Sequence, residues 1–360
     1  MDHPHLSDRS VLNCSTPILG AVLAAAALVL TACGTDAEDA TAQNDTETAG
    51  LLPAAEGEAE YPLRLDTVHG EIEIEERPER IAVLGWNPNH DAAAALDVTP
   101  VYASSRSFDY GWMEEEWLDG IETLEERDDA DVNLESVAAA EPDLIFLPDT
   151  AEMLEEEDIE RLGEIAPVLE KEEVVAGDQV DWRDAPRLLG EVLDLTGAAE
   201  EAITEAEEAI EATAEENPQF DGRTITLATD YGEEYGLEYY TAAGGTAEEI
   251  VTMLGFAPNP LADQFSEEAS ISEENQEQLD ADVLIMFYAD DALREGREAS
   301  ELFQQIPAVE DDRHLAVVAE DDERAESGAV WVLRRGASVE SLPWMLDALA
   351  DWASEAGLED

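Results

Sequence analysis

The hydrophobic positions of the chain form short apolar runs that alternate with amphipathic stretches such as 134–140. The apolar runs, which are typical of buried strands, occur at 80–84, 100–102 and 143–147 in the first half and at 224–228, 283–287 and 315–318 in the second. Strands that are separated by helices usually form parallel sheets with both faces covered. The pattern therefore predicts an α/β fold in each half of the chain.

A long helix is predicted between the two halves, over residues 198–217 (AAEEAITEAEEAIEATAEEN). Small and apolar residues recur there at helical spacing, no Gly or Pro intervenes, and Pro218 follows directly. A helix of that length spans about 30 Å. We therefore expect an N-terminal α/β lobe over 61–197, a linking helix over 198–217 and a C-terminal α/β lobe over 218–360.

The first 32 residues have the layout of a secretory signal peptide. Residues 17–32 carry no charge and follow a polar start with one arginine, Arg9. A membrane-spanning anchor is the alternative, but a span normally needs about 20 apolar residues and this run is shorter and rich in alanine. The tetrad LTAC at 30–33 resembles the lipobox of bacterial lipoproteins, in which the cysteine becomes the lipidated first residue. We expect export, lipidation of Cys33 and attachment to the outer face of the cytoplasmic membrane.

The cysteine content agrees with that expectation. The chain has two cysteines, Cys14 and Cys33, so cleavage before Cys33 would leave one cysteine and no internal disulfide. Residues 33–60 follow as an acidic segment without a sustained apolar period, and we expect a disordered tether there.

The net charge limits which kinds of molecule the chain can bind and in which salt concentration it is stable. The chain has 90 Asp and Glu against 17 Lys and Arg, which gives a formal net charge of −73. Nucleic-acid binding is excluded as the main function because affinity for phosphates needs clustered cations. Repulsion among so many carboxylates weakens a compact fold in dilute buffer, whereas near molar salt the screening length is about 3 Å. The composition is therefore typical of a halophilic protein.

Five segments in chain order resemble the siderophore-binding lipoproteins of bacterial iron importers. They are 67–101 (with PERIAVLGW), 133–147 (NLESVAAAEPDLIFL), 271–287 (ISEENQEQLDADVLIMF), 302–318 (LFQQIPAVEDDRHLAVV) and 330–349 (VWVLRRGASVESLPWMLDAL). Asp97 stands where that family usually has glycine. The resemblance implies two Rossmann-like α/β lobes joined by a single long helix, with a ferric siderophore held in a cleft between the lobes. It also implies delivery to an ABC permease and its ATPase, no catalysis, no cofactor besides the ligand, and a monomer.

Ligands of open α/β sheets bind beyond the carboxyl ends of the strands. The residues that follow the predicted strands are Trp86, Asn87, Asp149, Tyr231 and Tyr288. Trp86 could instead pack against the next helix. Tyr231 and Tyr239 belong to 230–240 (DYGEEYGLEYY), which could equally be a hairpin with aromatic cross-strand pairs.

Three arginines are further candidates because cations are scarce in this chain. Arg106, Arg334 and Arg335 could form paired hydrogen bonds to carboxylate, catecholate or hydroxamate oxygens. The alternative is that each binds a structural carboxylate. The resemblance separately assigns Glu135 and Glu249 to contacts with arginines of the permease.

Other chemistry finds little support in the sequence. A metal receptor needs several converging histidines and carboxylates, but only His69, His90 and His314 follow Cys33. The sequence has no nucleophile elbow, Walker loop or dinucleotide fingerprint, and Gly244-Gly245 is too short for a phosphate cradle. Two alternatives stay open: a cobalamin or haem receptor of the same fold, and a sensory or adhesive surface lipoprotein without a transport role.

Overall fold

The computed structural model describes residues 50–358 apart from 69, 128–131, 152–153, 171, 175–180 and 233–234, and for 149–151, 172–174 and 335 it describes the backbone alone. The expected signal peptide, Cys33 and the tether up to residue 49 lie outside the described residues. So do His69 and the side chains of Asp149 and Arg335. Among the helices that are described, none is long and apolar enough to cross a membrane.

The N-terminal lobe is built on a five-stranded parallel sheet with the order β5-β4-β3-β6-β8. Its strands are β3 (Ile81–Leu84), β4 (Tyr102–Ser105), β5 (Leu124–Glu126), β6 (Leu144–Phe146) and β8 (Val168–Leu169). The helices are α1 (Asn87–Ala95), α2 (Glu115–Gly120), α3 (Leu134–Ala139), α4 (Glu156–Gly163) and α5 (Asp184–Leu193). An antiparallel hairpin of β1 (Leu63–Thr67) and β2 (Gly70–Ile74) precedes the sheet, and β7 (Asp149–Ala151) pairs with β9 (Glu172–Val174). Separate apolar clusters cover the two faces of the sheet, as the continuous apolar runs predict.

The C-terminal lobe has a mixed five-stranded sheet with the order β12-β11-β10-β13-β14. Its strands are β10 (Ile225–Asp230), β11 (Leu237–Tyr239), β12 (Ser270–Ile271), β13 (Val283–Tyr288) and β14 (His314–Val318). The helices are α7 (Thr246–Met253), α8 (Asp291–Glu298), α9 (Pro307–Glu310), α10 (Glu323–Glu326), α11 (Ala329–Arg335) and α12 (Ser341–Glu355). β10, β13 and β14 are parallel, whereas β11 and β12 are antiparallel to their neighbours. The aromatic segment 230–240 therefore leads from β10 into its antiparallel neighbour β11, and β12 lies beyond β11 at the edge of the sheet.

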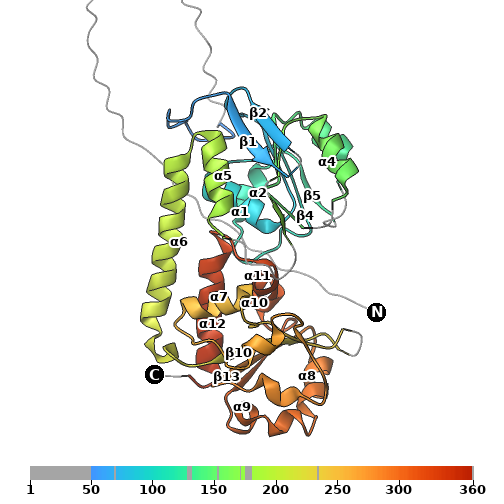
Figure 1. Ribbon diagram of the computed structural model, residues 1–360, viewed down its shortest axis with the longest axis vertical. Coiled ribbons are helices and arrows are strands. Elements are labelled where there is room, and N and C mark those ends of the chain that lie inside the picture. The colour runs from blue at the N-terminus through green and yellow to red at the C-terminus, as the bar shows by residue number, and fades with distance from the viewer. Residues whose placement is uncertain are drawn as a thin grey trace, which may run out of the picture. The chain divides into compact units, whose positions relative to one another are not determined.

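Helix α6 (Thr196–Glu216) joins the lobes and begins two residues before the predicted linking helix. It packs on α5 at one end and on α12 at the other, which Figure 1 shows. Its buried residues are Ala199, Ile203 and Ala206, which lie on one helical stripe. The long helix predicted from the alanine-rich period is thus present between two α/β lobes.

Residues 50–60 differ from the expected disordered tether, because they lie against the N-terminal lobe. The Glu56 carboxylate accepts hydrogen bonds from the backbone N–H groups of Gly197 (2.7 Å) and Ala198 (2.9 Å) in the first turn of α6. Asp194, in the left-handed conformation with φ 55°, accepts from the backbone of residues 57–59. The segment is held because a helix N-terminus leaves N–H groups that an acidic side chain can satisfy.

The two lobes also meet directly, at a contact that we call the junction. Asp91 of α1 accepts hydrogen bonds from the Trp112 indole (3.1 Å to each oxygen) and from the Ser338 hydroxyl (2.6 Å). The Gly111 N–H donates to the Ser327 carbonyl at 2.9 Å. Gly328 has φ +115°, and a Cβ there would clash with the Tyr110 ring. The junction therefore fixes the segment after β4 against the region between α10 and α12.

The residue that departs from the family pattern has a local explanation. Asp97, which follows α1, has φ 53° in the left-handed region. Glycine adopts this region freely, and aspartate tolerates it better than most residues do. The substitution therefore preserves the turn that leads towards β4.

Candidate ligand-binding site

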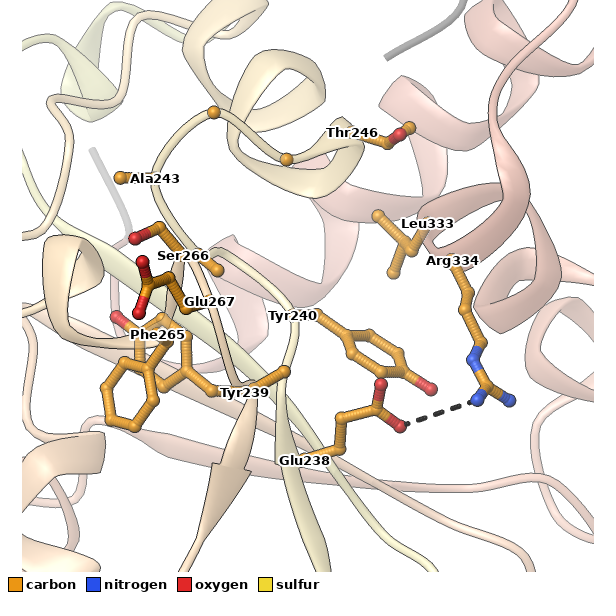
Figure 2. A pocket seen from close by; sticks show the side chains of 14 residues that line it. Glu238, Tyr239, Tyr240, Ala243, Thr246, Phe265, Ser266, Glu267, Leu333 and Arg334 are labelled. Carbon is orange, nitrogen blue, oxygen red and sulfur yellow. Dashed lines mark ion pairs between the residues drawn. The ribbon is translucent and has the colours of Figure 1, made fainter. Parts of the chain in front are cut away.

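A pocket of about 380 Å³ opens on the C-terminal lobe beside the β10–β11 hairpin. It is lined by Glu238, Tyr239, Tyr240, Ala242, Ala243, Gly244, Gly245, Thr246, Phe265, Ser266, Glu267, Ala269, Leu333 and Arg334. The walls thus come from β11, the loop before α7, the segment before β12 and the last turn of α11. Figure 2 shows the Glu238 carboxylate next to the Tyr240 ring, with the Arg334 guanidinium at the other end of the dashed ion pair.

Register explains why the hairpin supplies this wall. Asp230, the last residue of β10, pairs with Leu237 of β11 and with Tyr288 of β13, so β11 starts at the carboxyl edge of the parallel strands. The chain then turns through Gly244, with φ 78°, into the first turn of α7. The pocket therefore begins near the carboxyl edge of the parallel strands, where α/β proteins bind ligands, and continues along β11 away from that edge.

Arg334 is the cation of the pocket wall. Its Nη2 lies 3.8 Å from Glu238 Oε2, and its Cζ lies 5.6 Å from the centre of the Tyr231 ring. The Arg334 side chain is 41% exposed, so this pair is well hydrated and holds the guanidinium weakly. Arg334 therefore has both a structural carboxylate partner and an open side.

Two tyrosines support this wall from within. The Tyr231 and Tyr240 hydroxyls are hydrogen-bonded to each other, and the Tyr240 side chain is buried. Burial raises the pKa of Tyr240, and the neighbouring Tyr231 raises it further. Both desolvation and this neighbour disfavour a phenolate. Tyr240 is consequently a neutral hydrogen-bonding group at any physiological pH.

Arg106 connects the N-terminal lobe to α11, the helix that carries Arg334. Its guanidinium lies 5.9 Å from the centre of the Trp331 ring, a cation–π contact between the lobes. Trp331 and Arg334 are three residues apart on α11 and therefore lie on one face of it. The structure thus brings Arg106 and Arg334, two of the three predicted arginines, to one helix, while the side chain of Arg335 is not described.

Four other predicted residues are buried. Trp86 and Asn87 are each 3% exposed, Tyr239 is 1% exposed and Tyr288 is 2% exposed. Tyr239 stacks on Phe265 with ring centres 4.2 Å apart, and its hydroxyl lies 3.3 Å from that of Thr226. Tyr239 therefore contributes mainly to packing at the pocket wall; its residue partner on β10 is Ala228, so the stacked pair with Phe265 is not a cross-strand pair.

Two of these buried predicted residues each have one polar atom without a hydrogen-bond partner among the described residues. They are Nδ2 of Asn87, at the start of α1, and the hydroxyl of Tyr288, at the end of β13. Burial raises the pKa of Tyr288, as does the nearby charge of Asp230, so its hydroxyl keeps its proton. Both groups are held at carboxyl ends of strands, where the sequence placed them.

The two glutamates assigned to the permease have different surroundings. Glu135 is exposed in the first turn of α3. Glu249 on α7 is half-buried, and burial raises its pKa, with repulsion from Asp181 acting in the same direction. Glu249 is therefore a less accessible group than Glu135.

Several wall residues were missed by the sequence reasoning. Glu238 and Glu267 are two acids among 90, so composition gave no signal for them. Gly244-Gly245 is too short a motif to predict a site, although both glycines line the pocket at the turn before α7. In the described part of the chain, no group of three or more His, Cys, Asp and Glu is arranged to hold a metal ion.

Residues 81–316 match the family model of the periplasmic binding proteins, which covers more than half of the chain. The chain is a periplasmic binding protein. Members of this family bind substrates and are not enzymes, which confirms the expectation of no catalysis. The search of curated proteins returns no match.

Solved structures share the fold of this periplasmic binding protein at low sequence identity. PiaA of Streptococcus pneumoniae in complex with ferrichrome has 23% identity and a TM-score of 0.64, with coverage of 81% of this chain and 98% of PiaA. SirA of Staphylococcus aureus with staphyloferrin B has 19% identity and a TM-score of 0.60, with coverage of 81% and 98%. The triscatecholate siderophore-binding FeuA of Bacillus subtilis with Ferri-Bacillibactin has 16% identity and a TM-score of 0.57, with coverage of 82% and 100%. The predicted two-lobe α/β fold is thereby confirmed.

Proposed function

We propose that the chain is the extracytoplasmic, lipid-anchored binding component of an ABC importer, which captures a ferric siderophore and delivers it to a permease and its ATPase. The observation that carries the proposal is the pocket on the C-terminal lobe, with Tyr240 and Arg334 on its walls. Structures of the same fold were solved with ferrichrome, staphyloferrin B and Ferri-Bacillibactin, which supports a ligand of this kind here. A siderophore is a large, oxygen-rich chelate, and such a ligand suits aromatic walls with a few polar groups.

The exposure of the predicted residues suggests which of them contact the ligand and which support the pocket walls. Arg106, Tyr231 and Arg334 keep exposed or half-exposed side chains, and we propose them, together with the pocket-lining Tyr240, as direct contacts of the ligand. Trp86, Asn87, Tyr239 and Tyr288 are buried, and we propose that they support the walls behind those contacts. Asp149 and Arg335 stay proposed contacts because of their positions in the sequence.

Tryptophan fluorescence tests the proposal. Ferric chelates absorb in the near ultraviolet and visible, so a chelate bound near Trp331 on α11 should quench emission. The titration uses ferric hydroxamate, catecholate and carboxylate siderophores, with haem and cobalamin, in molar salt, and free tryptophan amide corrects for light absorbed by the chelate. Replacing Tyr240 with Ala should weaken binding about tenfold or more, as expected for an aromatic contact of 1–3 kcal/mol. The control Tyr61→Phe removes a hydroxyl that donates to the Val192 carbonyl in the N-terminal lobe.

The outcomes separate the alternatives within the binding class. Saturable quenching by a ferric siderophore that Tyr240→Ala weakens and Tyr61→Phe does not supports the proposal. Tight binding of haem or cobalamin alone would identify the other receptor class, and no quenching by any complex would contradict a siderophore receptor. For a sensory or adhesive lipoprotein, the neighbouring genes discriminate: permease and ATPase genes favour import, and a kinase gene favours sensing.

For the permease contact, we propose Glu135 on the N-terminal lobe, and the structure offers two candidates on the other lobe. Glu249 was predicted from the resemblance. Glu274 is exposed and stands as far before Asp282 as Glu135 does before Asp143. Those two aspartates play matching roles: Asp143 accepts from the backbone at 79–80 before β3, and Asp282 accepts from Thr224 before β10. This internal symmetry favours Glu274 over Glu249 as the partner of Glu135.

A further inference from the structure

The charges on the pocket wall bear on which class of ferric complex can enter it. Of the described residues that line the pocket, Glu238 and Glu267 are acids and Arg334 is the one cation; Arg106, another proposed contact, is not among them, and the side chain of Arg335 is not described. The Arg334 guanidinium faces the Glu238 carboxylate at 3.8 Å and the Tyr231 ring on another side. The wall therefore presents a compensated arginine and one additional negative charge.

Ferric complexes differ in charge according to their chelating groups. Three hydroxamates, each singly charged, neutralise Fe(III), whereas three doubly charged catecholates leave the complex trianionic. An anion that reached Arg334 would approach the Glu238 carboxylate too, and like charges a few ångströms apart repel each other, an effect that salt weakens. A neutral complex meets no such cost.

The remaining wall groups suit an uncharged ligand. Tyr240, Phe265 and Leu333 provide apolar surface, and Ser266 and Thr246 provide hydroxyls. The Tyr240 hydroxyl is protonated and bonded to that of Tyr231, so it adds no charge. Hydroxyls and aromatic faces recognise amide and hydroxamate groups by hydrogen bonds and contact area, without counter-charges.

We propose that this pocket selects uncharged ferric complexes of the trihydroxamate class and that Glu238 is the residue that excludes anionic complexes. This inference rests on the proposed function, because it specifies the ligand of the same site. Glu238 excludes anions in two ways: its carboxylate already pairs with Arg334, and its negative charge repels an anionic ligand that would have to take its place beside that arginine.

The test compares dissociation constants of one neutral ferric trihydroxamate and one trianionic ferric tricatecholate for the mature protein. The parent should bind the neutral complex at least tenfold more tightly. Glu238→Gln should tighten the anionic complex about fivefold or more and change the neutral one less than twofold. Glu310→Gln removes an equal charge from the exposed surface of α9 and should change neither constant appreciably. Because repulsion is screened by salt, the preference of the parent should also grow at the lower of two salt concentrations in which the chain stays folded.

Three results would overturn the inference while leaving a siderophore receptor intact. The first is tighter binding of the anionic than of the neutral complex by the parent. The second is a ratio of the two dissociation constants that Glu238→Gln leaves unchanged. The third is a larger loss of affinity for the anionic complex than for the neutral complex in Arg334→Gln. The parent protein tests the selectivity without any substitution, because the dissociation constants of the neutral and anionic complexes are compared directly. The inference is therefore tested even if a variant fails to fold. Failure to bind either complex would instead reject the proposed function.

Discussion

Asp91 carries the sharpest prediction for the junction between the lobes. Its side chain is 1% exposed, and its hydrogen-bond donors, Ser338 and Trp112, are both neutral. Burial raises the pKa of this carboxyl from 3.8 to about 7, against the lowering effect of the two donors, and the charge of Glu340 acts in the same direction as burial. Asp91→Asn removes the titrating group and keeps the shape of the side chain.

The expected effect follows from proton linkage. A native carboxyl with a raised pKa stabilises the fold fully below the unfolded pKa, and that stability is lost as pH rises through about 7. Each unit of pKa difference corresponds to about 1.4 kcal/mol. The advantage of Asp91→Asn over the parent should therefore grow by about 2.5 kcal/mol between pH 5 and pH 8 and then stay level.

Urea denaturation in molar salt measures the free energy of unfolding of both proteins across this range. The difference between the two curves isolates Asp91 from the many other carboxyls. Asp119→Asn, on the exposed surface of α2, controls for the loss of one carboxyl. A difference that does not change with pH would refute the effect of burial. An advantage that shrinks as pH rises would show that the hydrogen bonds from Trp112 and Ser338 keep Asp91 ionised.

Four further predictions address the lipid anchor, the salt dependence of stability, the junction and the contact with the permease. Cys33→Ser should leave the protein unlipidated and release it from the membrane fraction; a variant as membrane-bound as the parent would favour an anchor helix. The melting temperature should fall from molar to dilute salt because screening weakens, and a flat profile would reject a halophilic protein. Gly328→Ala should lower the free energy of unfolding by roughly 2–4 kcal/mol in urea titrations, through backbone strain and an aromatic clash, and a loss below 1 kcal/mol would contradict that packing. Replacing Glu135 and Glu274 with Ala should abolish uptake at unchanged ligand affinity, while Glu249→Ala should retain uptake; the reverse would restore Glu249 as the docking residue.

The sequence was sufficient for the parts of the fold that depend on periodic burial. The runs at 80–84, 143–147, 224–228 and 283–287 became central parallel strands because both faces of each sheet are covered. The linking helix was predictable from its alanine and isoleucine stripe. The ordered segment at 50–60 was not, because its contacts are polar bonds from Glu56 and to Asp194, which leave no apolar period to read.

The site was only partly predictable for a related reason. Arg334 and Tyr231 stood out because arginine is scarce and the aromatic segment follows a strand. Glu238 became relevant only once the antiparallel return of β11 placed it beside Arg334. Trp86 and Tyr288 were assigned from their position at strand ends, but position alone does not fix side-chain exposure, and both are buried.

The central claim is that the pocket lined by Tyr240 and Arg334 on the C-terminal lobe holds a ferric siderophore. The most direct measurement is a crystal structure of the protein grown with a ferric trihydroxamate, in which anomalous scattering at the iron edge locates the metal. The account predicts one strong iron peak beside the pocket wall, with the chelate in contact with Tyr240 and Arg334. An iron peak elsewhere on the protein, or none in crystals saturated with the complex, would contradict it.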